Sequence, residues 1–463
     1  MNHLGELFDE LARRHGERRL VEQPGGRTLT YCEAADLVSR WSSLVTPGDT
    51  VVVALPNGYD QLLACVAVAR GGGIPVPVND RMGPEEIEHV VANSGATTVW
   101  RDVTGGEPVE PREPATMAAI FYTSGTTGLP KGARLSHEAL VGPLRRARWF
   151  PNRLRRDEAV IALPVAHIMG WVVLTGLAAV GVPVYVMPRF DAPAALDAIE
   201  RRRATVFVGV PAMYRMLLAA GAADRDLKSI RVWGSGADAM PGDLARAFQG
   251  FGATARVVGV DVGEALFVEG WGMVETGGAA IGRIALPYVG GPSWPVPGYR
   301  VKVAEDGELL VKSPGVLEGY HGDPAATAAA LDDGWLRTGD LVTRGRLGSV
   351  SFAGRKKDVI KSGGFSVFAA EVERVLEEHD GVVEAAVLGV DDARLGQVPV
   401  AVVRGDADTE ALMAFVRERL APYKVPRRIV VSADELPRGG TGKIQKDRLR
   451  AQVVGDSRRR SGL

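Results

Sequence analysis

The chain has 463 residues, of which 46% are hydrophobic and 24% charged, and its formal net charge at pH 7 is −1. This length exceeds what one hydrophobic core organises, so two or more domains are expected. The near-zero net charge excludes a basic nucleic-acid-binding protein and an acidic disordered one. Two cysteines, Cys32 and Cys65, are too few for a disulfide framework or a zinc site, and their apolar neighbours predict buried side chains in a reducing cytoplasm.

Neither a secretory signal nor a membrane span is expected. Residues 1–14 are charged and lack an apolar core. The stretch from Ile168 to Met187 is uncharged and, at about 20 residues, long enough to suggest a span. Gly181-Val182-Pro183 interrupts it, however, and a β-branched run follows at 184–186. We therefore expect a buried helix, a turn and a buried strand of a soluble core.

The first half of the chain alternates strand and helix patterns, which predicts βαβ units and parallel sheets covered by helices. Strands are expected at 50–55, 74–78, 97–100, 117–122, 159–163, 184–187, 205–210 and 230–233. Helices are expected at 59–70, 84–94, 193–202 and 211–220.

Beyond about Tyr288 the pattern changes. Clustered prolines and glycines precede short strands at 300–303 and 308–312, which predict a small β region. The charged segment Gly354–Asp358 follows, and after it comes a compact C-terminal region of alternating helices and strands. We expect a first domain over 1–354, a second over 355–455 and a disordered tail over 456–463. The elements expected in the second domain are helices at 368–378 and 409–420 and strands at 382–390, 398–403 and 429–431.

One polar stretch follows a predicted buried strand. Its six small or hydroxylated residues precede Lys131, and a turn of this kind can hold phosphate oxygens through backbone N–H groups and the lysine charge. We expect it to leave the carboxyl end of a parallel strand, where such folds bind ligands. Leu129 and Pro130 separate glycine from lysine, so it is not the P-loop of NTPases, and an ordinary polar loop is the alternative. The six residues are Thr123, Ser124, Gly125, Thr126, Thr127 and Gly128.

Four further features bear chemistry. Trp271 can stack on a base, and Glu275, four residues later, can bind Mg²⁺ through oxygen. Asp340 is a single acid at the end of a predicted turn, suited to accept hydrogen bonds from the two hydroxyls of a sugar. Arg355 could contact the same hydroxyls. Lys443 lies in the glycine-rich loop 436–446 and could neutralise a carboxylate or an α-phosphate. Taken singly, each is also typical of a surface loop.

Together and in this order, these features resemble the adenylate-forming superfamily of acyl-CoA synthetases, peptide-synthetase adenylation domains and beetle luciferases. The resemblance spans about residues 5–450. It implies an α/β protein with a large N-terminal domain of parallel, helix-covered sheets plus a small β region, and a smaller mobile C-terminal α+β domain. The segments that carry it are Leu55–Asn57, Pro75–Asn79, Tyr122–Gly132, Trp271–Glu275, Thr338–Asp340, Gly354–Asp358, Ser362–Gly364, Glu371–Glu373 and Gly442-Lys443.

The resemblance also implies a two-step reaction that uses ATP, Mg²⁺ and CoA. A small-molecule carboxylic acid attacks the α-phosphate of ATP, giving acyl-AMP and pyrophosphate, and the thiol of CoA then displaces AMP. Glu275 is the implied metal ligand, and Lys443, Glu275, Thr123 and His167 are the implied catalytic residues. The implied ATP-binding residues are Thr123, Ser124, Gly125, Thr126, Thr127, Gly128, Lys131, Gly236, Ala237, Asp238, Trp271, Gly272, Met273, Val274, Asp340, Arg355 and Lys443.

Three further sets of residues follow from the same resemblance. Lys357 matches the hinge about which the C-terminal domain rotates. For His167 a satisfied core histidine is the alternative to a pocket residue. The implied acyl pocket is lined by His167, Met169, Gly170, Val208 and Gly234, and the implied CoA path by Ser362, Gly363, Gly364 and Phe365.

Some positions depart from the family pattern. Val274 stands where a threonine is usual, Ala369 replaces a proline, and the segment Phe251–Phe267 is longer than usual. The apolar residues around the implied pocket favour an aromatic or medium-chain acid. No clear second cation for a dicarboxylate is present in the sequence, and Arg283 is the one residue left open for that role.

Three functions are compatible with the sequence. The first is an acyl-CoA synthetase, an acid–thiol ligase. The second is a stand-alone adenylation enzyme that transfers the acyl group to a carrier protein or a nitrogen nucleophile. The third, motivated by Val274, is a non-catalytic module that binds a nucleotide or an acyl-adenylate.

Overall fold

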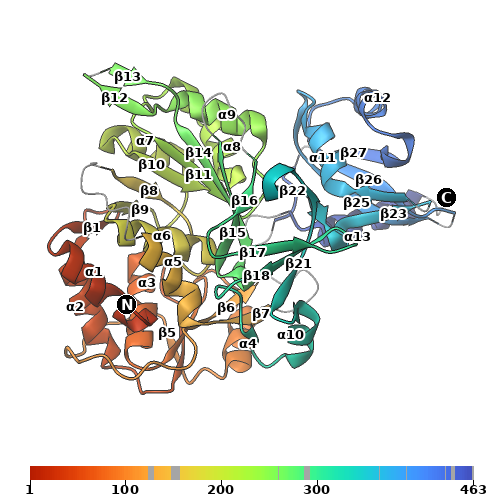
Figure 1. Ribbon diagram of the computed structural model, residues 1–463. Helices are drawn as coiled ribbons and strands as arrows, with labels where there is room; N and C mark the ends of the chain where they lie inside the picture. The colour runs from red at the N-terminus through yellow and green to blue at the C-terminus, as the bar shows by residue number, and fades with distance from the viewer. Residues whose placement is uncertain are drawn as a thin grey trace. The chain divides into compact units, whose positions relative to one another are not determined.

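The computed structural model describes residues 1–123, 130–147, 157–258, 260–285, 292–363, 365–392, 394–432, 434–438 and 444–460. It divides into two compact units, Met1–Val301 with Val311–Leu336, and Lys302–Leu310 with Arg337–Leu463 (Figure 1). The division falls before the junction near Arg355 that the sequence suggests, because residues 337–344 pair with 350–355: Asp340 is the register partner of Arg355. The domain boundary at 354 and 355 stays a prediction.

The first unit contains ten α-helices among its described residues, and the predicted helices are all present. Pro84 and Pro211 open their helices, and Asp191 caps another by accepting the Ala194 N–H at 2.9 Å. The helices are α1 (Leu7–His15), α2 (Tyr31–Ser42), α3 (Tyr59–Arg70), α4 (Pro84–Ser94), α5 (His137–Ala147), α6 (Ile168–Val180), α7 (Ala192–Arg202), α8 (Pro211–Ala219), α9 (Gly242–Phe251) and α10 (Pro324–Ala330).

A nine-stranded sheet forms the frame of this unit, in the order β16-β15-β14-β11-β10-β8-β9-β1-β2. Its central pairs, from β14 to β1, are parallel, and only its two ends are antiparallel. Its strands are β1 (Arg19–Glu22), β2 (Thr28–Thr30), β8 (Ala159–Ile161), β9 (Val184–Val186), β10 (Val206–Gly209), β11 (Val232–Gly236), β14 (Leu266–Met273), β15 (Gly278–Ala285) and β16 (Trp294–Pro295).

Helices cover both faces of this sheet (Figure 1). Phe207, Trp233 and Phe267 are fully buried in one hydrophobic cluster with residues of α7, α8 and α9. Residues of α6 and α5 belong to a second and larger cluster that also holds Ile161. The predicted class of parallel, helix-covered sheets is confirmed.

Three smaller sheets complete the first unit, in the orders β4-β3-β5, β19-β7-β6 and β12-β13. Only the first of these is parallel. The strands are β3 (Thr50–Val53), β4 (Ile74–Pro77), β5 (Thr98–Trp100), β6 (Ala119–Thr123), β7 (Lys131–Leu135), β12 (Ala255–Val257), β13 (Val260–Val262) and β19 (Gly319–Tyr320), with the short strand β20 (Leu331–Asp332) besides.

The strand before the polar loop does not lie in a parallel sheet, contrary to the expectation from the sequence. β6 pairs antiparallel with β7 along its whole length, from Ala119↔Leu135 to Thr123↔Lys131. The loop explains this result: seven residues can join antiparallel neighbours, whereas a parallel crossover needs a dozen or more. The alternation of strands and helices earlier in the chain gave no sign of this local reversal.

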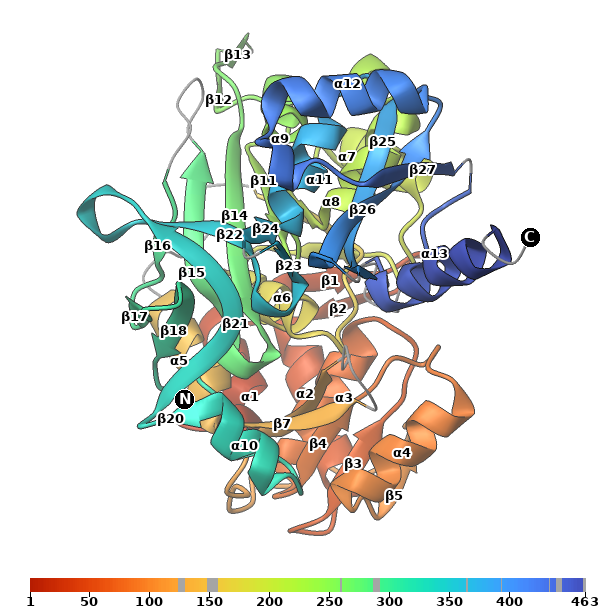
Figure 2. The ribbon, with the colours of Figure 1, turned by 90° about the vertical axis from the view of Figure 1, so that its right-hand side faces the viewer.

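The unusually long segment before Trp271 forms a hairpin. β12 and β13 pair with each other and with no further strand among the described residues, and they project from the rest of the unit (Figures 1 and 2). Val258 and Val260 are exposed there. The extra residues therefore form a surface hairpin that is not part of the nine-stranded sheet.

The second unit is an α+β unit, as predicted. Its five-stranded sheet has the order β24-β23-β26-β25, with β27 beside β26, and apolar clusters lie on both of its faces. β17, β18 and β21 each have residues in both units. The elements are β17 (Arg300–Val303), β18 (Glu308–Lys312), β21 (Trp335–Arg344), β22 (Val350–Arg355), β23 (Val359–Ser362), β24 (Phe365–Phe368), α11 (Ala369–Glu377), β25 (Val382–Asp392), β26 (Gly396–Gly405), α12 (Thr409–Arg419), β27 (Arg428–Ser432) and α13 (Lys446–Arg460).

Two local expectations are corrected. α13 continues to Arg460, so the backbone at 456–460 is helical; the helix is anchored earlier by buried Leu449 and Val453. Cys65 is buried as predicted, but Cys32 is only half-buried because it lies near the start of α2.

The stretch considered as a membrane span also resolves as predicted. α6 covers 13 residues and ends at Gly181 in the left-handed conformation, and β9 follows. Within the described ranges, no helix has both the length and the apolar composition needed to cross a bilayer.

A half-buried histidine, His137, predicts how stability depends on pH. His137 Nδ1 accepts the Leu4 N–H at 3.1 Å, and its Nε2 lies 2.9 Å from the Ala115 carbonyl oxygen. Burial lowers the pKa of His137, and the nearby His3 adds to this, although the Ala115 carbonyl opposes it. The neutral ring is therefore the folded form. Its contribution is complete above the unfolded pKa of about 6.5 and is lost as the pH falls through the lower folded pKa.

We expect His137→Asn to reduce the loss of Tm between about pH 7.5 and about pH 5.5, because asparagine can accept the Leu4 N–H but cannot be protonated. Thermal unfolding at the two pH values measures this. Some loss remains in the variant, since burial also lowers the pKa of His321. An unchanged pH dependence would contradict the assignment.

Candidate active site

The two ends of the predicted phosphate loop are held in place. Thr123 Oγ1 lies 3.5 Å from the Lys131 carbonyl oxygen across the β6–β7 pair. His89 Nε2 of α4 lies 2.9 Å from the Pro130 carbonyl oxygen. Residues 124–129 lie outside the described residues, so the predicted roles of Ser124, Gly125, Thr126, Thr127 and Gly128 stay predictions. Nothing in the sequence pointed to His89.

The predicted metal ligand is a buried carboxylate. Glu275 lies in the 3₁₀ turn η3 (Val274–Thr276) and is 7% exposed. Its Oε1 accepts the hydroxyl of Tyr320 at 2.8 Å, and its carbonyl oxygen accepts the Leu317 N–H at 2.9 Å. Val274 is also buried and belongs to the large apolar cluster, which accounts for an aliphatic side chain at that position.

Tyr320 was not identified from the sequence, although it connects several predicted residues. Burial raises the pKa of Tyr320, and the charge of Glu275 and its hydrogen bond raise it further. Lys131 Nζ lies 5.5 Å from the centre of its ring. The same lysine makes an ion pair at 3.5 Å with Asp323, whose pKa is lowered by the Ala326 N–H and, less strongly, by Lys131. The motif Gly-Tyr-His-Gly at 319–322 is the signal that could have been followed.

The residues predicted to border the base lie at the ends of two adjacent parallel strands. Gly236 ends β11 beside its register partner Gly270 of β14, and β14 continues through Trp271 and Gly272 to Met273. The carboxyl ends of parallel strands are where open α/β sheets bind ligands.

The residues that follow β11 depart from regular structure. Ala237 has a φ of 66°, a left-handed conformation that costs energy for a residue with a Cβ. Asp238 is exposed, and its Oδ1 accepts the Ala239 N–H at 2.9 Å. A strained turn at this strand end is consistent with a binding role.

The predicted acyl-pocket residues lie on one face of these strands. A methyl group built on Gly236 would lie 3.4 Å from Met169 Sδ, and one built on Gly234 would lie 3.0 Å from Val208. Gly170 allows α6 to begin close to the preceding turn, since a methyl there would lie 2.0 Å from the Pro164 carbonyl oxygen. The half-buried apolar side chains of this region are Met169, Val172, Val208, Val210 and Met213.

His167 is neither exposed nor a core residue. It precedes α6, and its Nδ1 accepts the Met169 N–H at 3.2 Å. The ring is half-buried. The structure therefore gives it a capping role beside the predicted pocket.

The candidate second cation is engaged elsewhere. Arg283 of β15 makes an ion pair with its cross-strand partner Glu269 of β14. Glu269 is in register with Ser235, so both point to the face opposite Gly234 and Gly236. Arg283 is thus not placed to bind a second carboxylate on the acyl face.

In the second unit, the two predicted sugar-binding residues meet. Asp340 is 2% exposed and lies inside β21, not at the end of a turn as expected. Arg355 Nε lies 2.8 Å from Asp340 Oδ1, and Arg355 Nη1 donates to the Thr338 carbonyl oxygen at 3.2 Å. Asp340 is therefore paired with Arg355, the arginine predicted to bind the same sugar hydroxyls.

The residues predicted to form the hinge and the CoA path are also in the second unit. Lys357 is exposed in the 3₁₀ turn η5 (Lys356–Asp358). Ser362 is buried and pairs with Phe365 at the end of the β23–β24 hairpin, and Gly363 has a φ of 56°, as a tight hairpin turn requires. Phe365 stacks on Tyr423 with ring centres 4.5 Å apart. Gly364 and Lys443 lie outside the described residues.

The residues of the first unit are compatible with Mg²⁺ bound together with a triphosphate. Among the residues that the structure describes, no group of three or more His, Cys, Asp or Glu side chains converges as a metal site. Mg²⁺ commonly uses one or two carboxylates, with phosphates and water supplying the other oxygens. The buried, hydrogen-bonded Glu275 provides a ligand of that kind.

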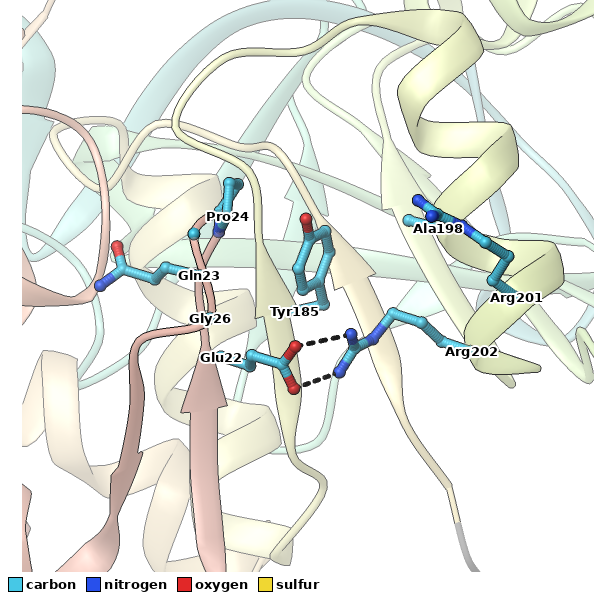
Figure 3. A pocket seen from close by; sticks show the side chains of 9 residues that line it. Glu22, Gln23, Pro24, Gly26, Tyr185, Ala198, Arg201 and Arg202 are labelled. Atoms are coloured by element: carbon cyan, nitrogen blue, oxygen red, sulfur yellow. Dashed lines mark hydrogen bonds and ion pairs between the residues drawn. The ribbon is translucent and has the colours of Figure 1, made fainter.

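A cleft of about 330 Å³ lies elsewhere on the first unit, between the β1–β2 turn, β9 and α7 (Figure 3). Its main polar groups are paired with each other. Arg202 makes hydrogen bonds of 2.8 and 2.5 Å to Glu22, and its guanidinium lies 4.5 Å from the centre of the Tyr185 ring. No predicted site residue lines this cleft.

Comparisons with known families cover most of the chain. The profile described as AMP-binding enzyme matches residues 8–108 and 99–321, and the profile described as AMP-binding enzyme C-terminal domain matches residues 371–443. Among curated relatives, a feruloyl-CoA synthase of Amycolatopsis sp. is 34% identical, over 92% of this chain and 94% of its own length. An indoleacetate–CoA ligase of Aromatoleum aromaticum is 32% identical over the same shares.

Solved structures agree in fold. The o-succinylbenzoate CoA synthetase of Bacillus subtilis, in complex with ATP and a magnesium ion, has a TM-score of 0.81 and 26% identity, over 96% of this chain and 99% of that one. An amide bond synthetase from Marinactinospora thermotolerans has a TM-score of 0.83 and 25% identity, over 97% of this chain and 99% of that one.

A matched pair of glycines predicts where the site tolerates no side chain. A methyl built on Gly272 would lie 1.9 Å from the Gly278 carbonyl oxygen, whereas one on Gly282 would come no closer than 3.5 Å to Val296. We expect Gly272→Ala to lower the free energy of unfolding by about 1–3 kcal/mol, because two backbones must separate. Gly282→Ala should stay within about 0.5 kcal/mol of the wild type. Denaturant unfolding of both variants measures this; equal effects would contradict it.

Proposed function

The chain belongs to the AMP-binding enzyme family, and from this premise we propose that it is an ATP-dependent acyl-CoA synthetase, an acid–thiol ligase acting on an aromatic carboxylic acid. The observation that carries the proposal is the joint presence of the Glu275 carboxylate, the Lys131 end of the phosphate loop and an uncharged acyl face within one unit. The feruloyl and indoleacetate ligases among its relatives act on acids of that type, by their names.

In the proposed first step, an oxygen of the carboxylate attacks the α-phosphorus of ATP. The bond from that phosphorus to the bridging oxygen breaks, and pyrophosphate leaves. Lys131 and the N–H groups of the preceding loop would hold the β- and γ-phosphates, and Lys443 would offset the repulsion between carboxylate and α-phosphate. Mg²⁺, when bound at Glu275, would neutralise charge on the phosphates.

In the proposed second step, the sulfur of CoA attacks the acyl carbon, the bond from that carbon to the AMP oxygen breaks, and the thiol loses its proton. The turn at Ser362, Gly363 and Phe365 would border the path of the thiol-bearing arm. Lys357 would serve as the hinge between the two steps. Asp340, oriented by Arg355 at 2.8 Å, would accept hydrogen bonds from ribose hydroxyls.

The acyl face supports an apolar, ring-containing acid. Its half-buried side chains are aliphatic or thioether groups, and methionines adapt to irregular or aromatic ligands. The pairing of Arg283 with Glu269 argues against a dicarboxylate bound through that arginine.

A second candidate is an enzyme that passes the same acyl-adenylate to an amine or to a carrier protein. The structural similarity to an amide bond synthetase favours the amine. A non-catalytic nucleotide-binding module is less well supported, because the buried Glu275 and the Asp340–Arg355 pair are both organised.

A panel of acids tests the proposed function. With ATP and Mg²⁺, ferulate, indoleacetate, benzoate, octanoate, malonate and acetate are each assayed for pyrophosphate release, with and without CoA. We expect the best aromatic acid to exceed acetate and malonate by at least about tenfold in kcat/KM and to yield a CoA thioester. Pyrophosphate release with amide but no thioester formation would favour the second candidate, and no release with any acid would favour the binding module.

Lys443→Ala separates the two half-reactions. We expect it to lower pyrophosphate release by about 10²-fold or more, because one cation is removed from the transition state, and to leave thioester formation from supplied acyl-AMP nearly unchanged. Rapid-quench measurements of each half-reaction check this. Normal adenylation by the variant would show that the lysine has another role.

A further inference from the structure

Tyr320 belongs to a segment that fixes Glu275 in two ways. The backbone N–H of Leu317 donates to the Glu275 carbonyl oxygen at 2.9 Å, and the Tyr320 hydroxyl donates to Glu275 Oε1 at 2.8 Å. Tyr320 is itself held by β19, in which it is the register partner of Ala133 on β7. Its N–H also donates to Thr327 Oγ1 at 2.9 Å. The carboxylate is thus oriented by a side chain whose own backbone is fixed.

The ring of the same tyrosine contacts the end of the phosphate loop. Lys131 Nζ lies 5.5 Å from the ring centre, within the range of a cation–π interaction. Asp323, three residues after Tyr320, pairs with Lys131 at 3.5 Å and caps α10 by accepting the Ala326 N–H at 2.8 Å. Tyr320 therefore contacts both Glu275 and Lys131, the two residues that would bind the same metal–triphosphate ligand.

The two contacts use different parts of the side chain. The hydroxyl is a neutral donor that fixes one carboxylate oxygen of Glu275, whereas the ring face meets the ammonium group of Lys131. Partners that hydrogen-bond a metal-binding carboxylate commonly change metal affinity by about 10- to 100-fold when removed. A change restricted to the hydroxyl should therefore affect metal binding and leave the lysine contact intact.

We propose that Tyr320 is a positioning residue that sets the orientation of Glu275 for Mg²⁺ and couples it to the Lys131 end of the phosphate loop. This proposal rests on the proposed function, since it takes Glu275 as the metal ligand for bound ATP.

Calorimetric titration of the full chain with ATP, in Mg²⁺ and in EDTA, tests the proposal without requiring turnover. For the wild type we expect Mg²⁺ to strengthen ATP binding. In Tyr320→Phe, which keeps the ring, this gain should fall by about tenfold, while ATP affinity in EDTA and AMP affinity stay within about twofold. The half-saturating Mg²⁺ concentration for pyrophosphate release should rise by a similar factor, with KM for the acid unchanged.

Tyr299→Phe is the matched control. The Tyr299 hydroxyl donates to the Thr276 carbonyl oxygen at 2.6 Å, so this change removes a buried hydroxyl one residue from Glu275 without touching the carboxylate. We expect it to leave the Mg²⁺-dependent gain unchanged. Tyr320→Leu removes ring and hydroxyl together and should also weaken ATP binding in EDTA, because Lys131 loses its contact.

The outcomes are distinct. A Mg²⁺-dependent gain in Tyr320→Phe within twofold of the wild type would overturn the proposal, and so would an equal loss in Tyr299→Phe. A wild type that binds ATP equally with and without Mg²⁺ would instead overturn the role of Glu275 in the proposed function, and this proposal with it. Thermal unfolding of each variant identifies any that fails to fold.

Discussion

Close approach of backbones is the constraint on which this site depends. At the ends of β11 and β14, glycines stand at positions where side chains would collide with the neighbouring strand: a methyl on Gly236 would lie 2.8 Å from the Gly270 carbonyl oxygen, and one on Gly272 only 1.9 Å from that of Gly278. The absence of these side chains lets β14 and β15 approach each other, and it leaves the space beside Gly234 and Gly236 to Val208 and Met169. Trp271 and Glu275 are placed by the same geometry, since Trp271 lies near the end of β14 and Glu275 lies in the 3₁₀ turn that follows this strand.

In each unit, the charged groups predicted to bind ligands are held by partners within that unit. Glu275 is held by a neutral hydroxyl, Asp340 by Arg355, and Lys131 by Asp323. A buried carboxylate without such a partner would be costly, and a hydroxyl satisfies it without cancelling its charge. Glu275 is therefore oriented by a neutral group, the Tyr320 hydroxyl, whereas Asp340 is already paired with the cation of Arg355. The two acids serve different purposes because their partners differ.

The sequence was sufficient for elements whose pattern is local. Helices 59–70 and 84–94 were predicted with their observed limits because proline, glycine and apolar spacing define them within the segment itself. The antiparallel pairing of β6 was missed, since it depends on a loop and a partner strand that carry no helical or strand signal of their own. The pairing of β14 with β15 was missed for a similar reason. Their glycines are typical of a loop in the sequence, whereas in the structure they allow two strands to pack closely.

Site residues divide in the same manner. Glu275, Asp340 and Arg355 could be named from motifs, but the register that joins Asp340 to Arg355 is a property of the β21–β22 pair. Tyr320 and His89 were not named from the sequence, because each contacts a group that is distant in sequence; only Tyr320 lies in a short motif, Gly-Tyr-His-Gly, that could have been followed. The resemblance to the family identified the candidate site residues, whereas the residues that contact them are seen only in the structure.

The contact at the start of α6 has a consequence for recognition. Because His167 Nδ1 accepts the Met169 N–H, the neutral imidazole must carry its proton on Nε2. In that tautomer Nε2 is a donor and cannot accept a hydrogen bond. A single helix cap thus selects the tautomer, and with it the polarity, that the ring presents.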